Sequence, residues 1–216
     1  MTAAAVDPVT GGYWLVSARG DVVAFHAPAV GDLAGSPPGV SIVGIAAPGD
    51  GKGYWLAASD GRVFAFGTAR LRGSAAGVGL NQPIVGIAAT PDGGGYWLVA
   101  RDGGIFAFGT ARFRGSTGGI RLNSPIVGMA AAPGGGYRLV ASDGGVFAFG
   151  APFYGSAAPV ATARRQSITG IAGDTATGGY WLVASSGTVY AFHAPFAGSA
   201  STTTSPAPMV AILGAH

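Results

Sequence analysis

A fivefold internal repeat constrains the fold of this chain more than any other feature of its sequence. The string "GYWLVA" (95–100) has close copies along the whole chain, and a string such as "ASDGGVFAFG" (141–150) follows or overlaps each copy. Repetition at an even interval indicates a structural unit that stacks on itself, whereas a catalytic motif is needed only once. The repeats are anchored at Tyr13, Tyr54, Tyr96, Tyr137 and Tyr180, spaced by 41 to 43 residues.

Each repeat of about 42 residues contains four apolar runs of strand length. In the third repeat they are "PIVGIAAT" (83–90), "GYWLVA" (95–100), "GIFAFG" (104–109) and "ARFRGS" (111–116). The runs are rich in β-branched and aromatic residues and are separated by Gly, Pro and Asp turns, and no segment shows the 3.6-residue period of a helix. We therefore predict an all-β chain made of four-stranded antiparallel units.

Each unit needs cover on both of its faces. In "YWLVA" the residues that point to either face are apolar, so a sheet of this kind packs against a neighbour on each side. The first run of each repeat, such as "IVGIAA" (84–89), is rich in Gly and Ala, which suits the crowded centre of a narrow ring. These patterns predict a five-bladed β-propeller that forms a single domain over residues 1–216.

The two ends of the chain compete for one position in this ring. The string "PMVAILGA" (208–215) matches the first run of the repeats, yet "MTAAAVDP" (1–8) already occupies that slot before Tyr13. We expect residues 209–214 to form a closing strand in the first blade, because pairing of the N- and C-terminal strands removes exposed sheet edges. The polar stretch at 199–208 is then a connection within the repeat. The alternatives are a window cut from a longer array and pairing with a second chain.

Composition argues against several classes of function. The net charge is +3 with scattered basic residues, whereas a nucleic-acid surface needs a dense basic patch. All nine acidic residues are aspartates and there is no cysteine, so neither a thiolate metal site nor a disulfide framework is available. Hairpin turns explain Asp60, Asp102 and Asp143, and no repeat joins a nucleophile to a base. We expect no catalytic residue, no enzyme activity, no cofactor and no metal.

Segments that would direct the chain to a membrane or a secretory route are not visible. No apolar run reaches 18 residues, so we expect no membrane span. The N-terminal residues "MTAAAVDPVTGGYW" lack the basic and long apolar regions of a signal peptide.

With "GYWLVA", "SDGGVFAFG", "F-x-GS" and "LNSPIVGMAA" considered together, the whole chain resembles a β-propeller repeat family of actinobacterial cell-envelope proteins, in which such repeats accompany cell-wall amidase or esterase domains. The resemblance implies an extracellular or cell-surface, non-catalytic propeller. A five-bladed layout is also similar to that of the tachylectin-type sugar-binding propellers, which is an analogy of architecture alone. The string "GTVYAF" (187–192) looks like quinoprotein propeller repeats, but the cofactor ligands of that family are lacking.

Candidate ligand-binding residues occupy two positions of the repeat. The residue after the anchoring tyrosine is Trp in four repeats and Arg in the fourth, and repeated aromatic plates would suit sugar stacking; alternatively each Trp fills the gap between blades. Asn residues precede two of the first runs, where they could bind a ligand or cap backbone groups. The candidates are Trp14, Trp55, Trp97, Arg138, Trp181, Asn81 and Asn123.

Two further groups are weaker candidates. His26 and His193 could share a metal, but no further ligands at suitable spacing accompany them, so turn histidines are the simpler interpretation. Arginines of the outer runs could contact an anionic polymer or could only keep a sheet edge soluble. These are Arg70, Arg72, Arg112 and Arg114.

The leading functional hypothesis is a non-catalytic module that binds carbohydrate or cell-wall polymer through repeated rim or inter-blade grooves. Multivalent contact would then raise a weak affinity per groove. The alternative is a structural or protein-interaction propeller without a small-molecule ligand.

Overall fold

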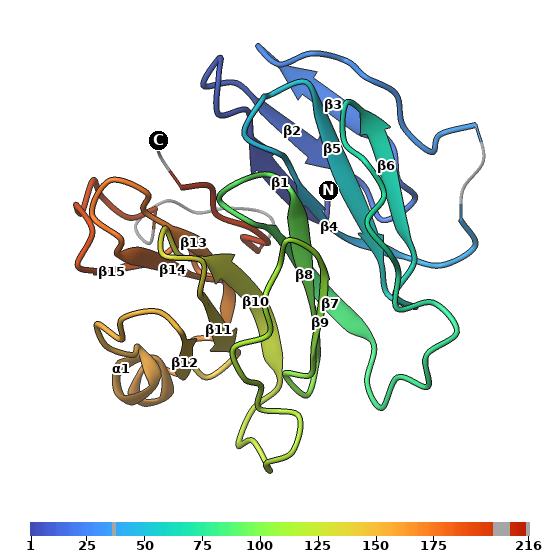
Figure 1. Ribbon diagram of the computed structural model, residues 1–216. Helices are drawn as coiled ribbons and strands as arrows, with labels where there is room; N and C mark the ends of the chain where they lie inside the picture. The colour runs from blue at the N-terminus through green and yellow to red at the C-terminus, as the bar shows by residue number, and fades with distance from the viewer. Residues whose placement is uncertain (36–37, 201–207, 215–216) are drawn as a thin grey trace.

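The computed structural model shows a chain made almost entirely of β-strands (Figure 1). It describes residues 1–35, 38–200 and 208–214. Fifteen strands form five three-stranded antiparallel sheets, and each sheet contains three consecutive strands in chain order. The predicted all-β class and the fivefold repetition are confirmed.

Each sheet corresponds to one repeat, and we number the sheets 1 to 5 in chain order. Sheet 1 contains β1 (Ala3–Val6), β2 (Tyr13–Val16) and β3 (Val22–Phe25), and sheet 2 contains β4 (Ile42–Ala46), β5 (Gly53–Ala58) and β6 (Val63–Gly67). Sheet 3 contains β7 (Ile84–Ala89), β8 (Gly95–Ala100) and β9 (Ile105–Gly109), and sheet 4 contains β10 (Ile126–Ala131), β11 (Tyr137–Ala141) and β12 (Val146–Phe149). Sheet 5 contains β13 (Ile168–Gly173), β14 (Tyr180–Ala184) and β15 (Val189–Phe192).

The Asp-Gly strings form the hairpin between the second and third strands of a sheet, as their composition predicts. In sheet 3, Gly103 has a φ of +81°, a conformation that favours glycine. The carboxylate of Asp102 accepts a hydrogen bond of 2.9 Å from the backbone N–H of Gly104. This turn sets the register in which Tyr96 lies opposite Phe108.

The first strands of the five sheets gather around one cavity. β4 lies beside β1 and β7, and β10 lies beside β7 and β13. All five strands line a cavity of about 230 Å³ together with residues 212–214. Its wall includes the small side chains of Ala46, Ala88, Ala130 and Ala172, which agrees with the prediction that a crowded centre excludes large side chains.

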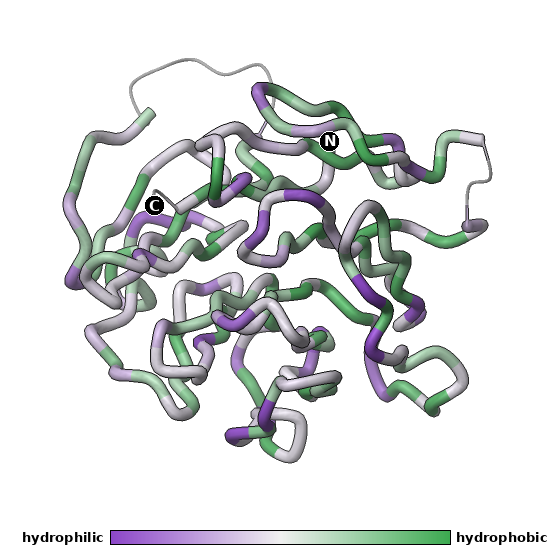
Figure 2. The backbone as a smooth tube through the Cα atoms, turned by 45° about the horizontal axis from the view of Figure 1, so that its top comes forward, coloured by the Kyte–Doolittle hydropathy of each residue, from purple (hydrophilic) through white to green (hydrophobic). Residues whose placement is uncertain are grey.

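The apolar core lies between neighbouring sheets. The second strand of sheet 2 is buried along its whole length, and Trp55 packs on Tyr96 of sheet 3 with the ring centroids 5.1 Å apart. Hydrophobic and hydrophilic stretches alternate along the backbone (Figure 2). Both faces of an inner sheet are therefore covered, as the pattern of "YWLVA" predicts.

The prediction of four strands per unit is wrong, because the outer run of each repeat joins no sheet. In sheet 3 the run "ARFRGS" (111–116) follows Gly109, where the backbone turns at a φ of +67°. Its backbone is bonded by a side chain of the next sheet: the Tyr137 hydroxyl accepts from the Arg114 N–H and donates to the Gly115 carbonyl, at 3.0 and 2.6 Å. A side-chain clamp thus replaces a strand ladder.

The predicted closing strand is also wrong. Residues 209–214 form no strand, and the inner position of sheet 1 is held by β1, which pairs with β2 through Ala5 and Trp14. With that edge occupied, the C-terminal segment runs alongside β13 instead (Figure 1). Most of the connection expected at 199–208 lies outside the described residues.

One short helix was not expected from the sequence. Helix α1 (Ala158–Ala163) lies in the connection that follows sheet 4, begins next to a proline at its first positions, and buries Ala161. Proline preset for the first helical turn, followed by small residues, allows this single turn and a half. Within the described residues, no helix has the length and apolar character needed to cross a membrane.

Candidate functional site

The tryptophan position of the repeat belongs to the core. Trp14, Trp55 and Trp97 are 0 to 1% exposed, and each ring packs on the anchoring tyrosine of the next sheet. Every indole N–H is also used: Nε1 of Trp55 donates to the Arg70 carbonyl at 2.9 Å, and the other tryptophans make equivalent bonds. The structure therefore corrects the sugar-stacking prediction for these three residues, because a buried ring offers no face to a ligand.

Trp181 differs from the other tryptophans in having no following sheet to cover it. Its Nε1 donates to the Pro195 carbonyl at 2.7 Å, so the ring is held in the same way. Its side chain is only partly buried. This is the one tryptophan of the predicted set with accessible ring surface.

Arg138 occupies the tryptophan position in sheet 4 and is fully buried. Its Nε donates to the Pro152 carbonyl at 2.9 Å, which reproduces the indole bond, and its Nη2 donates to the Gly178 carbonyl at 2.8 Å. The guanidinium carbon lies 4.7 Å from the ring centroid of Tyr180. Burial lowers the pKa of Arg138. The prediction of a ligand-binding arginine is corrected: this cation is part of the core.

The two asparagines lie on the surface where the inner strands begin. Asn81 and Asn123 are exposed, and neither side chain makes a hydrogen bond within the described part of the chain, so neither caps the backbone there. Asn123 lines a groove of about 280 Å³ together with Arg101, Asp102 and Gln82. The structure thus brings Asn123 to a polar groove and leaves Asn81 outside it.

A second polar groove, of about 290 Å³, lies between sheets 3 and 4 at the other end of the inner strands. We call it the arginine groove. Arg112 and Arg114 are both exposed, and neither guanidinium group has a hydrogen-bond or ion-pair partner within the described residues. Its lining residues are Thr90, Pro91, Asp92, Trp97, Thr110, Arg112, Arg114, Pro133, Gly134 and Gly135.

An aspartate with a fixed orientation stands at the edge of the arginine groove. Asp92 accepts hydrogen bonds from the hydroxyls of Thr90 and Thr110 at 2.5 and 2.8 Å, and from the Gly94 N–H at 3.0 Å. The Thr90 bond, followed by that of Gly94, lowers the pKa of Asp92. The groove therefore offers a carboxylate that is ionised near neutral pH together with two exposed cations.

The same set of side chains recurs one sheet earlier. Asp50 accepts from the Lys52 N–H at 3.0 Å and from the Thr68 hydroxyl at 2.8 Å, and these two bonds lower the pKa of Asp50. Arg70 and Arg72 follow this threonine as Arg112 and Arg114 follow Thr110. The pairing of Asp and Thr was not predicted, although their recurrence 18 residues apart in both repeats is the signal that could have revealed it.

Four repeats expose a large apolar side chain two positions before the glycine of the outer run, and not at the tryptophan position. The side chains are 57 to 61% exposed and come from four successive repeats. Sequence reasoning passed over them because the outer run was expected to be a strand, in which such residues would be half covered. We call them the rim residues: Leu71, Phe113, Phe153 and Phe196.

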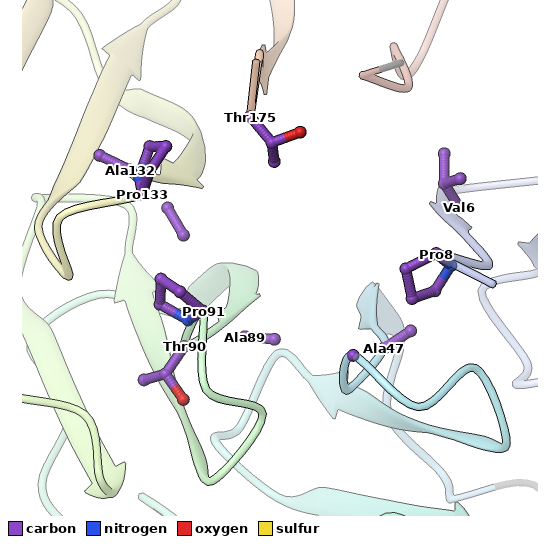
Figure 3. Close-up of a pocket in the computed structure, with 11 residues that line it drawn as sticks. Val6, Pro8, Ala47, Ala89, Thr90, Pro91, Ala132, Pro133 and Thr175 are labelled. Atoms are coloured by element: carbon purple, nitrogen blue, oxygen red, sulfur yellow. The ribbon is translucent and has the colours of Figure 1, made fainter. Parts of the chain in front are cut away.

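A further cavity, which is mainly apolar, opens at the ends of the inner strands. It has a volume of about 400 Å³ and is lined mainly by Ala, Pro and Val from all five repeats (Figure 3). Thr90 and Thr175 supply its only side-chain hydroxyls, and that of Thr90 is already bonded to Asp92. Few polar groups remain to orient a ligand there.

The two histidines occupy equivalent turns. His26 and His193 both have a φ of +52°, and the ring of His193 stacks on Tyr154 with the centroids 4.4 Å apart. In the described residues, no three side chains of His, Asp, Glu or Cys type come together as a metal site would require.

Compared with protein-family models and with curated proteins, the sequence matches none of them.

Proposed function

We propose that this chain is a non-catalytic binding module with a propeller architecture, and that its ligand is an anionic carbohydrate or cell-wall polymer held in the arginine groove. The expectation of an extracellular or cell-surface location, taken from the repeat resemblance, belongs to this proposal. The chemistry of the groove supports the anionic character of the ligand.

The propeller assignment is supported by the placement of the sheets. Five similar antiparallel sheets have their first strands around one cavity, and sheets 1 to 4 each pack the second strand on the next sheet. An arrangement of this kind leaves the connections at both ends of the inner strands, where propellers bind ligands. The observed fold is an all-β repeat, and the propeller assignment adds that its five sheets are arranged as blades around one centre.

The observation that carries the proposal is the pair of exposed, unpartnered guanidinium groups on one groove. Arg112 and Arg114 can each donate two parallel hydrogen bonds to a carboxylate or a phosphate. Asp92 and Thr110 add an acceptor and a hydroxyl of the kind that binds sugar hydroxyls. Since Arg70 and Arg72 repeat the pair on the neighbouring sheet, a polymer could engage both sets, and the affinities would combine.

The test compares two polysaccharides that share a backbone. Polygalacturonate carries carboxylates and its methyl ester does not. We expect the protein to bind polygalacturonate at least ten times more tightly in affinity electrophoresis, and the difference to shrink as salt screens the charges. Equal binding of both polymers, or binding of neither, would contradict the proposal.

A matched pair of variants locates the site. Arg112→Gln with Arg114→Gln removes both cations of the groove, and we expect a loss of most of the affinity for polygalacturonate. Arg19→Gln with Arg121→Gln makes the same change in net charge at exposed positions outside the groove lining and should retain it. A similar loss in both variants would mean that net charge alone attracts the polymer.

The rim residues favour a second candidate function, contact with a protein. Phe113, Phe153 and Phe196 are large apolar side chains on successive outer runs, and a row of such residues is typical of an interaction surface. Replacing Phe113 and Phe153 by Ser should then abolish binding of a protein partner while leaving polygalacturonate binding unchanged. The reverse result would assign the rim to the polymer.

A further inference from the structure

The C-terminal segment 208–214 occupies the place of a sixth inner strand. In every repeat after the first, the residue that opens this strand donates its N–H to a carbonyl in the preceding hairpin, as Ile168 does to Ser142 at 2.8 Å. Met209 makes the same bond to Ser185 at 3.1 Å. A Cβ built on Gly170 would lie 3.6 Å from Ile212 Cγ2, just as one on Gly128 would lie 3.5 Å from Ile171 Cγ2.

This C-terminal segment lies between sheets 5 and 1 (Figure 1). On its other side it faces Ala3, Ala4 and Leu15 across an apolar cavity of about 390 Å³. Among the described residues it has neither a second nor a third strand to pair with. In the five complete repeats these strands always come from one hairpin.

Sheet 5 has the residues that in the other sheets contact the tyrosine of the next sheet, but in the described part of the chain no next sheet packs on them. In each of those interfaces a tyrosine hydroxyl donates to a glycine carbonyl of the preceding outer run, as Tyr96 does to Gly73 and Tyr180 to Gly155, both at 2.6 Å. Gly198 is the equivalent glycine after sheet 5, and no tyrosine hydroxyl of the described residues reaches it.

The backbone of Gly198 is already shaped for such a partner. Its φ is +127°, close to the +134° of Gly155 and the +131° of Gly115. A Cβ on Gly155 would lie 2.8 Å from Phe192 of the next sheet, so glycine is required there by close contact. A Cβ on Gly198 would meet no atom of the described residues within 4 Å. None of these residues fills the space that a phenylalanine fills elsewhere.

Sheet 1 has the residues of the other side of this interface, and no preceding sheet of the described structure packs on them. Its anchoring Tyr13 is 36% exposed and Phe25 is 41% exposed, whereas the tyrosines at the same position of the other sheets are 0 to 1% exposed. Elsewhere this tyrosine packs against the Trp or Arg of the preceding sheet. Tyr13 has no such neighbour in the part of the chain that the structure describes.

We propose that the space between sheets 5 and 1 is a docking site for one two-stranded hairpin with the pattern of this chain's own repeat. The hairpin pairs its first strand with residues 209–214. Its tyrosine covers Trp181 and donates to Gly198, and its tryptophan covers Tyr13. A second copy docked through a complete sheet fits less well, because its inner strand would occupy the place that residues 209–214 already hold.

The probe is a hairpin copied from the chain itself. Gly95 and Gly109 lie directly opposite each other in β8 and β9, so the ends of a peptide of residues 95–109 are close together. The peptide can be closed head to tail through a short flexible linker, which leaves every hairpin residue unchanged, and it then enters the test preformed. We expect saturable binding with one peptide per chain, together with slower amide hydrogen exchange in residues 209–214. Absence of saturable binding would overturn the proposal.

Two controls fix the site of docking. In the chain, Gly198→Ala adds a methyl group where the peptide phenylalanine must lie, and we expect at least a tenfold loss of affinity. Gly77→Ala is matched, because Gly77 also has a positive φ and open space around it, and it should bind as the parent chain does. In the peptide, Tyr96→Ala should also lose at least tenfold. Equal binding by the Gly198→Ala chain, or by the peptide lacking this tyrosine, would overturn the proposal.

Discussion

In the fourth repeat the guanidinium group of Arg138 takes the place that an indole ring has in the other repeats. Arg138 keeps the bond that a tryptophan Nε1 makes to the outer run, and its guanidinium carbon lies over the ring of Tyr180. It differs from tryptophan in carrying a charge into the core with no carboxylate beside it. Its Nη1 has no hydrogen-bond partner in the described structure, and such a group costs free energy when buried.

We therefore expect Arg138→Trp to stabilise the chain. Restoring the residue of the other repeats removes a buried charge and an unsatisfied donor, and we expect a gain of about 1 to 3 kcal/mol in the free energy of unfolding, measured in urea. The reverse exchange, Trp97→Arg, should destabilise by a similar or larger amount. A loss of stability in Arg138→Trp would mean that the bond to Gly178 outweighs these costs.

Alkaline pH should unfold the chain through its buried tyrosines. Burial, with a smaller contribution from the Asp32 carboxylate, raises the pKa of Tyr54 to about 12, and burial also raises those of Tyr96, Tyr137 and Tyr180. An unfolded tyrosine ionises near pH 10, so above that pH the unfolded state releases protons that the folded state keeps. Stability should be complete below about pH 10 and fall between about pH 10 and 12.

The pH dependence can be followed by urea unfolding at several pH values. The slope of the free energy against pH should decrease in Tyr54→Phe, which has one buried hydroxyl fewer, and should be unchanged in Tyr13→Phe, whose ring is exposed in the parent chain. A stability that is independent of pH up to 12 would show that these hydroxyls ionise freely in the fold.

At the scale of elements, the outer runs depend on the neighbouring sheet for their hydrogen bonds. The run that contains Arg72 and Gly73 is clamped by the hydroxyl of Tyr96, which accepts from the former at 3.1 Å and donates to the latter at 2.6 Å. One hydroxyl therefore satisfies two backbone groups at once. This is why a run with the composition of a strand can remain outside the sheet.

Tyr96→Phe should consequently lower the free energy of unfolding by more than the loss of one exposed hydroxyl would. The variant leaves a backbone donor and acceptor without partners in a partly buried interface, and we expect a loss of about 1 to 3 kcal/mol in thermal unfolding. Tyr13→Phe is the control, since the Tyr13 hydroxyl clamps no outer run among the described residues, and it should change stability by less than about 0.5 kcal/mol. Equal effects would contradict the clamp.

At the scale of the whole molecule, a short segment from the far end of the chain covers the last inner strand. Residues 212–214 complete the wall of the central cavity that the five inner strands otherwise line. Ile212 packs beside Gly170 of β13, while Val210 on the same segment is 49% exposed. The segment is thus held by its partly buried isoleucine.

A charge at the buried side of this segment should release it. In Ile212→Asp the carboxylate would lie against β13, and we expect faster amide hydrogen exchange in β13 and at Met209 because the covering segment detaches. Val210→Asp adds the same charge at a half-exposed position and should leave that exchange nearly unchanged. Identical exchange in the parent chain and both variants would contradict the proposed packing role of Ile212.

The sequence could predict what depends on local pattern. Spacing of the tyrosines defines five units, alternation in "YWLVA" requires cover on both faces, and the Asp-Gly strings specify the hairpins; all three appear in the structure. The candidate site was predicted less well. Of its seven residues, the structure brings Asn123 to a groove and leaves Trp181 partly accessible, while three tryptophans and Arg138 are core.

The remaining features were decided by contacts between units, which no local pattern records. Whether "ARFRGS" forms a fourth strand depends on the hydroxyl of Tyr137 in the following sheet. Residues 209–214 do not join sheet 1, because β1 pairs with β2 at that edge. The sequence by itself determined the repeating unit, because strand and turn preferences act over a few residues. Only the tertiary structure decided which strands form the sheet edges and which rim residues are exposed, because both depend on the neighbouring sheet that packs against them.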